Sequence, residues 1–410
     1  MTTAVHAPIV IIGGGHAAAQ LCASLAEAGQ GARVHLVCEE VHLPYQRPPL
    51  SKSYLKGPAE VLQFHRAEAW FAEHGVTLHL GDAALAIDRA ACTVSLRSGK
   101  ALAYERLVLA TGTRARRLPA LSEHLDNVAV LRHAVDAAAL RTRLADMLAA
   151  GERLTVLGGG FIGLEIAATA RLLGLPVEVL EGAPRLLARS VSPALAEHVL
   201  AHHRAAGIEV RLGVKVDAFE VTAQRLASLS VDGSKQGVDQ LVMGIGAVPE
   251  TALAQAAGLE VENGIVVDGA MRTSDPAILA IGDCASFIAR DGRRLRLESV
   301  QNANDQARTA AATLLGRDEP YQAVPWFWSE QGGLRLQMVG LLPAEPTSTR
   351  RAGATPQNFS LFHYDGDQLA CVESVNAPVD HMMARKFLEA GKSPAPALVG
   401  DPAVALKTLL

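Results

Sequence analysis

Two stretches of this 410-residue chain decide its fold: residues 9–18 read IVIIGGGHAA, and residues 154–163 read LTVLGGGFIG. Each stretch is a short apolar run, then three glycines, then the start of a segment rich in helix-forming residues. Continuous apolar runs of this length are typical of strands that are buried on both faces. A strand, a glycine turn and a helix in this order favour a fold that binds the phosphates of a dinucleotide at the helix N-terminus.

Each copy continues into a second apolar strand that ends near an acid. Residues 33–37 lead to Glu39, and residues 177–180 lead to Glu181. An acid at this place accepts hydrogen bonds from a ribose hydroxyl. The first glycine of the motif allows a tight turn, the second lets the main chain approach a pyrophosphate, and the third position must be small. These positions are Gly13, Gly15 and Ala18 in the first copy, and Gly158, Gly160 and Gly163 in the second.

A third repeated element completes the pattern, because residues 107–112 (LVLATG) and 241–246 (LVMGIG) are both apolar strands that run into small-residue turns. The fold class is therefore α/β, with two tandem dinucleotide-binding folds. Short strands are expected over residues 263–283 and a helix over 298–315. The expected domains are residues 1–115 with 247–325, residues 116–246, and a C-terminal α+β domain over 326–410, with strands at 334–339, 359–364 and 369–375 and a helix at 380–390.

Composition excludes several function classes. The chain has 38 Lys and Arg against 42 Asp and Glu, a net charge of −4, so there is no global basic field for nucleic acid or an anionic membrane. Aromatic residues are only 4% of the chain, which disfavours a binder of single-stranded nucleic acid. Residues 8–26 lack charge and approach a membrane span in length, but their glycine triplet favours a strand, turn and helix.

The cysteines exclude other chemistry. Cys22, Cys38, Cys92, Cys284 and Cys371 are an odd number, are far apart in sequence and form no C-x-x-C motif. Neither a disulfide framework nor a zinc site is expected. A reducing cytoplasm is the simplest location.

Further segments carry a family resemblance. Residues 273–283 (TSDPAILAIGD) and the turn at residues 110–112 (ATG) resemble motifs of the flavoprotein reductases that have two dinucleotide-binding folds of the glutathione-reductase type. Residues 44–52 (PYQRPPLSK), 298–302 (ESVQN) and 325–329 (PWFWS) resemble segments of the ferredoxin reductases of bacterial oxygenase systems, including those of aromatic-ring dioxygenases.

This resemblance implies FAD in the first fold and NADH in the second. His16 and Ala18 depart from the family, in which Leu and Gly are common at those places, and Ala84 aligns only with a gap. The implied FAD residues are Gly13, Gly15, His16, Ala17, Ala18, Glu39, Arg47, Pro49, Lys52, Ala84, Ala110, Thr111, Gly112, Arg132, Gly282, Asp283, Glu298, Ser299, Val300 and Trp328. The implied nicotinamide residues are Gly158, Gly160, Phe161, Ile162, Gly163, Glu181 and Gly246. Glu165, Trp328 and Lys52 are the candidates for a role beside the reacting groups.

The carboxylate of Glu181 would repel the extra phosphate of NADPH, so NADH is favoured. Arg185 is close enough in sequence to offset that preference.

The implied reaction is hydride transfer from NADH to FAD, then delivery of single electrons to a [2Fe–2S] ferredoxin. That ferredoxin would feed a terminal oxygenase, either a Rieske dioxygenase or a haem-thiolate monooxygenase. Disulfide reductases of this fold carry two cysteines after the first acid, and residues 40–52 contain none, so no thiol relay is expected. An acidic ferredoxin would be attracted by a local basic patch, with Arg290, Arg293, Arg294, Arg308 and Arg335 as candidates.

Three alternatives stay open. An NADH oxidase is disfavoured by the missing redox cysteine. A rubredoxin reductase is more closely related to the ferredoxin reductases than an NADH oxidase is, and is harder to exclude. A redox-responsive NADH-binding signalling protein that resembles apoptosis-inducing factor would show slow turnover and a long-lived charge-transfer complex.

Overall fold

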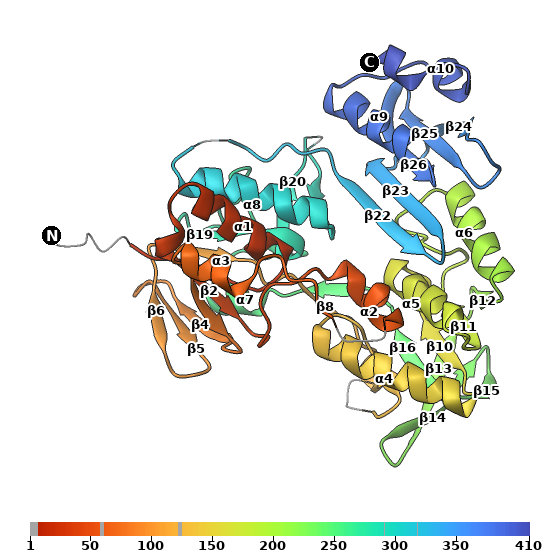
Figure 1. Cartoon of the computed structure of the whole chain (residues 1–410), viewed down its shortest axis with the longest axis horizontal. Helices are drawn as coiled ribbons and strands as arrows, with labels where there is room; N and C mark the ends of the chain where they lie inside the picture. The colour runs from red at the N-terminus through yellow and green to blue at the C-terminus, as the bar shows by residue number, and fades with distance from the viewer. Residues whose placement is uncertain (1–6, 58–60, 122–124, 291, 318) are drawn as a thin grey trace. The chain divides into compact units, whose positions relative to one another are not determined.

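A computed structural model describes residues 7–57, 61–121, 125–290, 292–317 and 319–410 (Figure 1). The chain forms two compact units. Unit 1 comprises residues 1–47, 62–114 and 248–325, and unit 2 comprises residues 48–61, 115–247 and 326–410. Strands β8 (Thr113–Ala115) and β17 (Ala247–Pro249) contain points at which the chain passes from one unit to the other.

The first glycine motif lies at the centre of a parallel sheet in unit 1. The sheet has the order β19-β7-β1-β2-β3. Its strands are β1 (Ile9–Ile12), β2 (Val34–Cys38), β3 (Thr77–Leu80), β7 (Arg106–Leu109) and β19 (Ile278–Ala280). All four residues of β1 are buried, as expected for a central strand with both faces covered.

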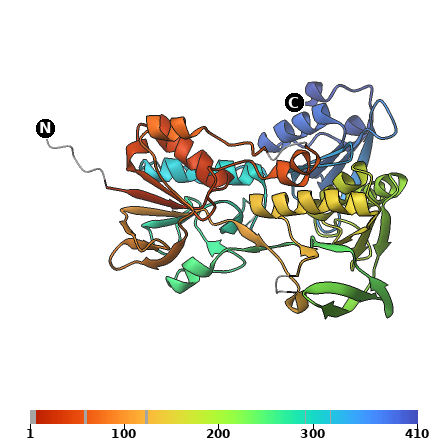
Figure 2. The same cartoon turned by 60° about the horizontal axis from the view of Figure 1, so that its bottom comes forward.

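Helices cover this sheet. Helix α1 (His16–Glu27) leaves the glycine turn and packs against α8 (Val300–Leu314), and the two lie side by side in Figures 1 and 2. Ser299 is the N-cap of α8, because its hydroxyl accepts a hydrogen bond from the Asn302 N–H at 3.1 Å. The helix therefore begins at Val300 and not at the expected residue 298. The other elements of unit 1 are α3 (Glu68–Glu73), β4 (Ala84–Asp88), β5 (Thr93–Leu96), β6 (Ala101–Ala103), α7 (Ala252–Ala256), β18 (Ile265–Val266), β20 (Ala285–Ile288) and β21 (Arg294–Leu295).

The second glycine motif has the same surroundings in unit 2. A second parallel sheet has the order β12-β11-β10-β16-β9. Its strands are β9 (Val128–Ala129), β10 (Leu154–Leu157), β11 (Val177–Glu181), β12 (Glu209–Leu212) and β16 (Gln240–Met243), and its helices are α4 (Ala134–Ala150), α5 (Phe161–Leu172) and α6 (Pro193–Ala205). The prediction of two tandem α/β folds is confirmed. A small antiparallel sheet adds β13 (Val216–Thr222), β14 (Arg225–Val231) and β15 (Ser234–Gly237).

The C-terminal segment of unit 2 is built on an antiparallel sheet of order β22-β23-β26-β25-β24. These elements are β22 (Trp326–Gln331), β23 (Leu334–Gly340), β24 (Thr347–Ala352), β25 (Phe359–Asp365), β26 (Gln368–Val375), α9 (Pro378–Glu389) and α10 (Pro396–Gly400). Helix α9 begins two residues before the expected position because Pro378 suits the first helical position. Single 3₁₀ turns lie at Gly31–Arg33, Pro48–Ser51, Pro119–Leu121, Gly282–Cys284 and Leu406–Leu409.

Residues 48–61 belong to unit 2, whereas the sequence pattern placed them with the first fold. Their contacts explain the difference. The side chain of Leu55 in α2 (Ser53–Lys56) joins the same hydrophobic cluster as Leu140 and Leu164. Thr169 Oγ1 on α5 also donates to the Ser51 carbonyl at 2.8 Å.

Within the described ranges no helix is long and apolar enough to cross a membrane. The same residues contain no group of three or more His, Cys, Asp or Glu side chains that could hold a metal ion.

Candidate functional site

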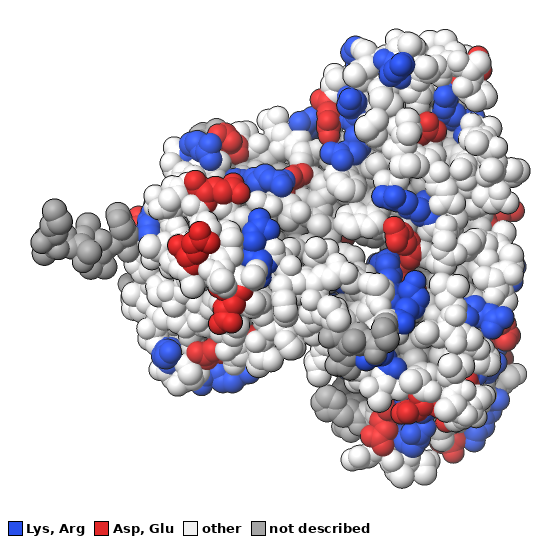
Figure 3. Space-filling view, viewed as in Figure 1, with Lys and Arg blue, Asp and Glu red and all other residues white. Residues whose placement is uncertain are grey.

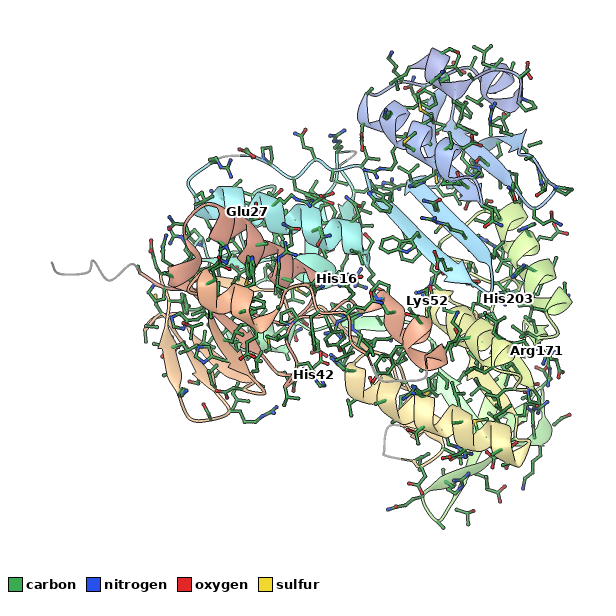
Figure 4. All side chains as sticks on the ribbon, in the orientation of Figure 1. His16, Glu27, His42, Lys52, Arg171 and His203 are labelled. Carbon is green, nitrogen blue, oxygen red and sulfur yellow. The ribbon has the colours of Figure 1, made fainter. Side chains whose placement is uncertain are left out.

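The first glycine turn in unit 1 leaves the backbone open at one glycine and tightly packed at another. Gly13 has φ +126°, and a Cβ there would lie 2.2 Å from the Ala110 carbonyl oxygen. A Cβ on Gly15 would have no described heavy atom within 4 Å. Gly15 precedes the first residue of α1, His16, which Figure 4 labels at that end of the helix. The turn therefore presents open backbone and the positive end of a helix dipole, which suit a pyrophosphate.

The residues of the second FAD-type motif come together with this turn. The Gly282 N–H donates to the Gln306 Oε1 at 2.7 Å, and a Cβ on Gly282 would lie 3.1 Å from the Ala17 Cβ. Arg296 supports the next residue by donating to the Asp283 carbonyl at 3.0 Å, and it pairs with Glu298 at 2.8 Å. Segments about 270 residues apart in the chain thus meet at the N-terminus of α1, because α1 and α8 pack together.

The ATG turn is supported from the segment after β17. Thr111 Oγ1 donates to the Glu250 carbonyl at 2.6 Å, and the Glu250 N–H donates to the Gly112 carbonyl at 2.9 Å. Ala110 supplies the carbonyl that packs against Gly13. These contacts hold three of the sequence-predicted residues in the same turn region of unit 1.

The charged candidates of unit 1 are Glu39, which is exposed, and Arg47, which is partly buried. Glu39 follows β2 and pairs with Arg97 at 3.2 Å at the surface. Arg47 donates to the Glu40 Oε1 at 2.9 Å, and Tyr45 donates to the Glu40 Oε2 at 2.6 Å. Sequence reasoning identified Arg47 but not its carboxylate partner, although Glu40 is next to Glu39. Ala84 begins β4 in the separate antiparallel sheet of order β4-β5-β6.

The second glycine turn, in unit 2, is packed in the same way. Gly158 has φ +108°, and a Cβ there would lie 2.5 Å from the Gly244 carbonyl oxygen. A Cβ on Gly163 would lie 2.3 Å from the Gly158 carbonyl oxygen, so α5 approaches its own turn too closely for any side chain. Gly160 has more space around it, with its nearest neighbour at 3.7 Å.

Two charged side chains near this turn have different roles. The Glu181 carboxylate accepts from the Gly159 N–H at 2.6 Å and from the Ala183 N–H at 2.7 Å, which anchors it beside the turn. Arg185 donates instead to the carbonyls of Val191 at 2.7 Å and Ala188 at 2.6 Å. The guanidinium of Arg185 therefore holds its own loop, whereas the carboxylate of Glu181 is anchored at the turn.

The remaining candidates for nicotinamide binding lie at the N-terminus of α5 and in the turn after β16. Phe161 opens α5 and lies against Phe327, with ring centroids 4.6 Å apart. The next residue, Ile162, is 47% exposed. Gly246 has φ +105°, and its carbonyl accepts from the Arg116 N–H at 2.9 Å.

A buried carboxylate in unit 2, that of Glu165, forms an ion pair with Lys52. Lys52 Nζ lies 2.5 Å from the Glu165 Oε2, and only 3% of the Glu165 side chain is exposed. Ser51 donates to the same oxygen at 2.5 Å, and Ser329 donates to the Glu165 Oε1 at 2.6 Å. Lys52 also donates to the Pro48 carbonyl at 3.1 Å. Both carboxylate oxygens therefore have partners, and the charge of Glu165 is compensated inside the protein.

Other candidates of unit 2 flank these residues along the chain. Pro49 lies in the 3₁₀ turn before Lys52, and Trp328 is half-buried on β22 beside Ser329. The Trp328 ring lies 5.5 Å from the Trp326 ring. Arg132 precedes α4, where its N–H donates to the Asp136 carboxylate at 2.9 Å.

Sequence reasoning missed the partners of Glu165. Ser51 and Ser329 were inside recognised segments, but nothing in either segment showed that their hydroxyls meet one carboxylate. Strand alternation was the available signal, since Ser329 and Gln331 are both fully buried while Glu330 between them is exposed.

The candidate docking arginines have different surroundings. Arg308 pairs with Asp305 at 2.5 Å and remains 57% exposed, and Arg294 pairs with Glu262 at 3.0 Å. Arg290, Arg293 and Arg335 are exposed. Figure 3 shows positive and negative side chains interspersed on the face that it draws.

The four buried cysteines are unsuited to redox chemistry. All five cysteines are free, and four of them are buried. Burial raises the pKa of Cys38 to about 12 and also raises the pKa of Cys284. A buried thiol of this kind is not the thiolate that a redox relay needs.

Comparisons with known proteins identify the family of the chain. Residues 7–307 match the family described as pyridine nucleotide-disulphide oxidoreductase, and residues 326–410 match the family described as reductase C-terminal. Rhodocoxin reductase of Rhodococcus erythropolis is 43% identical, over 93% of this chain and 89% of its own length. Putidaredoxin reductase of Pseudomonas putida is 39% identical, over 98% of this chain and 96% of its own length.

Solved structures extend the likeness. A ferredoxin reductase from Rhodopseudomonas palustris has a TM-score of 0.93 at 42% identity, covering 98% of this chain and 99% of that one. The structure of a covalent complex between putidaredoxin reductase and putidaredoxin matches with a TM-score of 0.92 at 39% identity, and covers 98% of each reductase chain.

Proposed function

The chain belongs to the pyridine nucleotide-disulphide oxidoreductase family, and we propose that it is an FAD-dependent reductase that passes electrons from NADH to a [2Fe–2S] ferredoxin. The observation that carries the proposal is the pair of glycine turns, one in each unit, each with a tightly packed first glycine. Two such turns suit two dinucleotides, and a solved structure that matches over 98% of this chain is named a ferredoxin reductase.

The residues of unit 1 fit FAD. The open backbone at Gly15 and the N-terminus of α1 would hold its pyrophosphate, and the anchored Gly282-Asp283 turn lies against the same helix end. Glu39 would accept from its ribose. When bound, FAD accepts a hydride and returns electrons singly, which a dinucleotide donor and a one-electron acceptor both require.

The residues of unit 2 would bind NADH. Gly158, Gly160 and Gly163 shape the turn for the pyrophosphate, and the anchored Glu181 would accept hydrogen bonds from the ribose hydroxyls. An anionic side chain at that place disfavours a 2′-phosphate, so the proposed donor is NADH.

Lys52, Glu165 and Trp328 are proposed to act beside the flavin. The Lys52 ammonium forms an ion pair with Glu165, and this ion pair holds the ammonium in place before any ligand binds. The role of these residues is positioning and electrostatic stabilisation, because hydride transfer itself needs no acid–base group.

The proposed acceptor is an acidic [2Fe–2S] ferredoxin that docks on local arginines, Arg308 among them, and feeds a terminal oxygenase. The described cysteines offer no thiol relay, which favours direct electron transfer to a protein partner over disulfide chemistry. The free cysteines also suit a reducing compartment, so the proposed location is the cytoplasm.

Anaerobic rapid mixing tests the function. The FAD-loaded protein is mixed with NADH, and then with a set of [2Fe–2S] ferredoxins and a rubredoxin, while flavin absorbance is followed. Fast bleaching by NADH and reoxidation by a [2Fe–2S] ferredoxin are expected. Reoxidation by rubredoxin alone, or by oxygen alone, would contradict the proposal and favour a rubredoxin reductase or an oxidase.

A further inference from the structure

A chain of hydrogen bonds leads from Glu165 through β22 to α6. Ser329 Oγ lies 2.6 Å from the Glu165 Oε1, Gln331 Nε2 lies 3.2 Å from the Ser329 Oγ, and His203 Nε2 lies 2.8 Å from the Gln331 Oε1. Ser329, Gln331 and His203 are each 0% exposed. Lys52 and His203, at the two ends of the chain of contacts, are labelled in Figure 4.

The direction of every bond in this chain is determined by Glu165. An ionised carboxylate only accepts, so Ser329 must donate its one proton to Glu165. Its hydroxyl oxygen then accepts from the Gln331 amide, whose carbonyl is left to accept from the N–H of His203. The imidazole is therefore the tautomer with its proton on Nε2.

His203 is suited to that neutral form. Burial lowers its pKa from 6.5 to about 4. Its Nδ1 is buried and has no hydrogen-bond partner among the residues that the structure describes. Among the described residues the ring nitrogens of His203 have one hydrogen bond, to Gln331, whose amide orientation is set by its bond to Ser329.

The other carboxylate oxygen has the cation. Lys52 and Ser51 both lie 2.5 Å from the Glu165 Oε2. A partial rotation of the carboxylate about its Cγ–Cδ bond would break both sets of contacts. The Ser329 bond opposes this rotation, because a buried Oε1 without a donor has a large desolvation cost.

We propose that Ser329, Gln331 and His203 are positioning residues, which hold the Glu165 carboxylate in one orientation and thereby hold the Lys52 ammonium in place. None of the three needs to contact a substrate or cofactor. The inference rests on the proposed function for its catalytic meaning, since Lys52 and Glu165 are proposed to act beside the flavin. Its structural content, the restraint of Lys52, can be measured separately.

The test uses the FAD-loaded protein with Ser329→Ala, Ser329→Thr and Gln331→Met. Acetic anhydride labels lysines, and peptide mass spectrometry compares acetylation of Lys52 with that of the exposed Lys407 as an internal reference. Anaerobic mixing with NADH gives the rate constant of flavin reduction and the NADH concentration at half-saturation. Glu330→Ala, an exposed change on the same strand, is the matched control.

Ser329→Ala is expected to raise Lys52 acetylation and to slow flavin reduction, each by about tenfold, since loss of one hydrogen bond to a buried charge is a change of this order. Half-saturation by NADH and Lys407 labelling should stay as in the parent. Ser329→Thr keeps the hydroxyl and is expected to restore both parent values. Gln331→Met, similar in volume, should give a smaller change in the same direction if Ser329→Ala does not fold.

Parent values of Lys52 acetylation in both Ser329→Ala and Gln331→Met would overturn the inference. Failure of the proposed function gives a different result. If Lys52→Met leaves flavin reduction unchanged, the pair has no role beside the flavin, while altered Lys52 acetylation in Ser329→Ala would still support the restraint.

Discussion

His381 on α9 is 4% exposed, and neither of its ring nitrogens has a hydrogen-bond partner within the described part of the chain. The ring lies edge-on to Trp326, with centroids 5.7 Å apart. Burial lowers the pKa of His381 from 6.5 to about 4, with smaller contributions from the charges of Arg385 and Arg335. At pH values between these two, His381 is neutral in the folded chain and mostly protonated in the unfolded chain.

This difference makes stability depend on pH. The unfolded chain binds more protons than the folded chain, so the contribution of His381 is fully present above pH 6.5 and is lost as the pH falls toward 4. With these two pKa values, the loss relative to neutral pH is about 2 kcal/mol at about pH 5 and about 3 kcal/mol at about pH 4. His381→Leu, which is close in volume and cannot titrate, should remove this loss.

The measurement is urea unfolding followed by circular dichroism, at about pH 7.5 and about pH 5, with FAD at the same saturating level in parent and variant. Subtracting the variant from the parent cancels the titration of every other group. The parent should lose about 2 kcal/mol more than His381→Leu over this range. Met382→Leu, at an exposed position of the same helix, is the control and should behave as the parent. Parent and His381→Leu curves that run parallel within about 0.5 kcal/mol would refute the reasoning.

Three further predictions concern nucleotide and partner binding. Gly163→Ala would place a methyl group 2.3 Å from the Gly158 carbonyl oxygen. The Kd for NADH should therefore rise by about tenfold or more, while FAD is retained. An unchanged Kd in an NADH titration would contradict the close approach. Arg185→Ala should change the ratio of kcat/KM for NADH to kcat/KM for NADPH by no more than about twofold, because the Arg185 guanidinium is held by backbone carbonyls. Glu181→Ser should shift the same ratio toward NADPH by about tenfold. A selective loss of NADPH activity in Arg185→Ala would show instead that Arg185 faces the nucleotide. Arg308→Glu should slow ferredoxin reduction at low salt by about tenfold and leave flavin reduction by NADH unchanged. Arg317→Glu is the control, because Arg317 is 58% exposed. Equal slowing by both variants would indicate a general charge effect instead of docking.

Some elements could be predicted because their signals are local. The helix expected over residues 298–315 is α8, shortened by the Ser299 cap, and the strands expected at 334–339 and 359–364 are β23 and β25, each one residue longer than expected. These signals lie in residues next to one another in the chain. Residues 48–61 could not be assigned by the same means, because their place depends on contacts with α5 and with the hydrophobic cluster of unit 2.

The sequence by itself determined the two glycine turns, the strands that lead into them and the acids that follow. Its information is sufficient there because Gly13 and Gly158 adopt backbone angles that other residues rarely adopt, so the residue type reports the conformation directly. Only the tertiary structure decided that Lys52, Ser51 and Ser329 meet at Glu165, and that Arg185 is held by its own loop. Lys52 and Ser329 are 113 and 164 residues from Glu165 in the chain, and no local pattern encodes such a distance. Their meeting follows from the packing of residues 48–52, α5 and β22, which buries one carboxylate and requires partners for both of its oxygens.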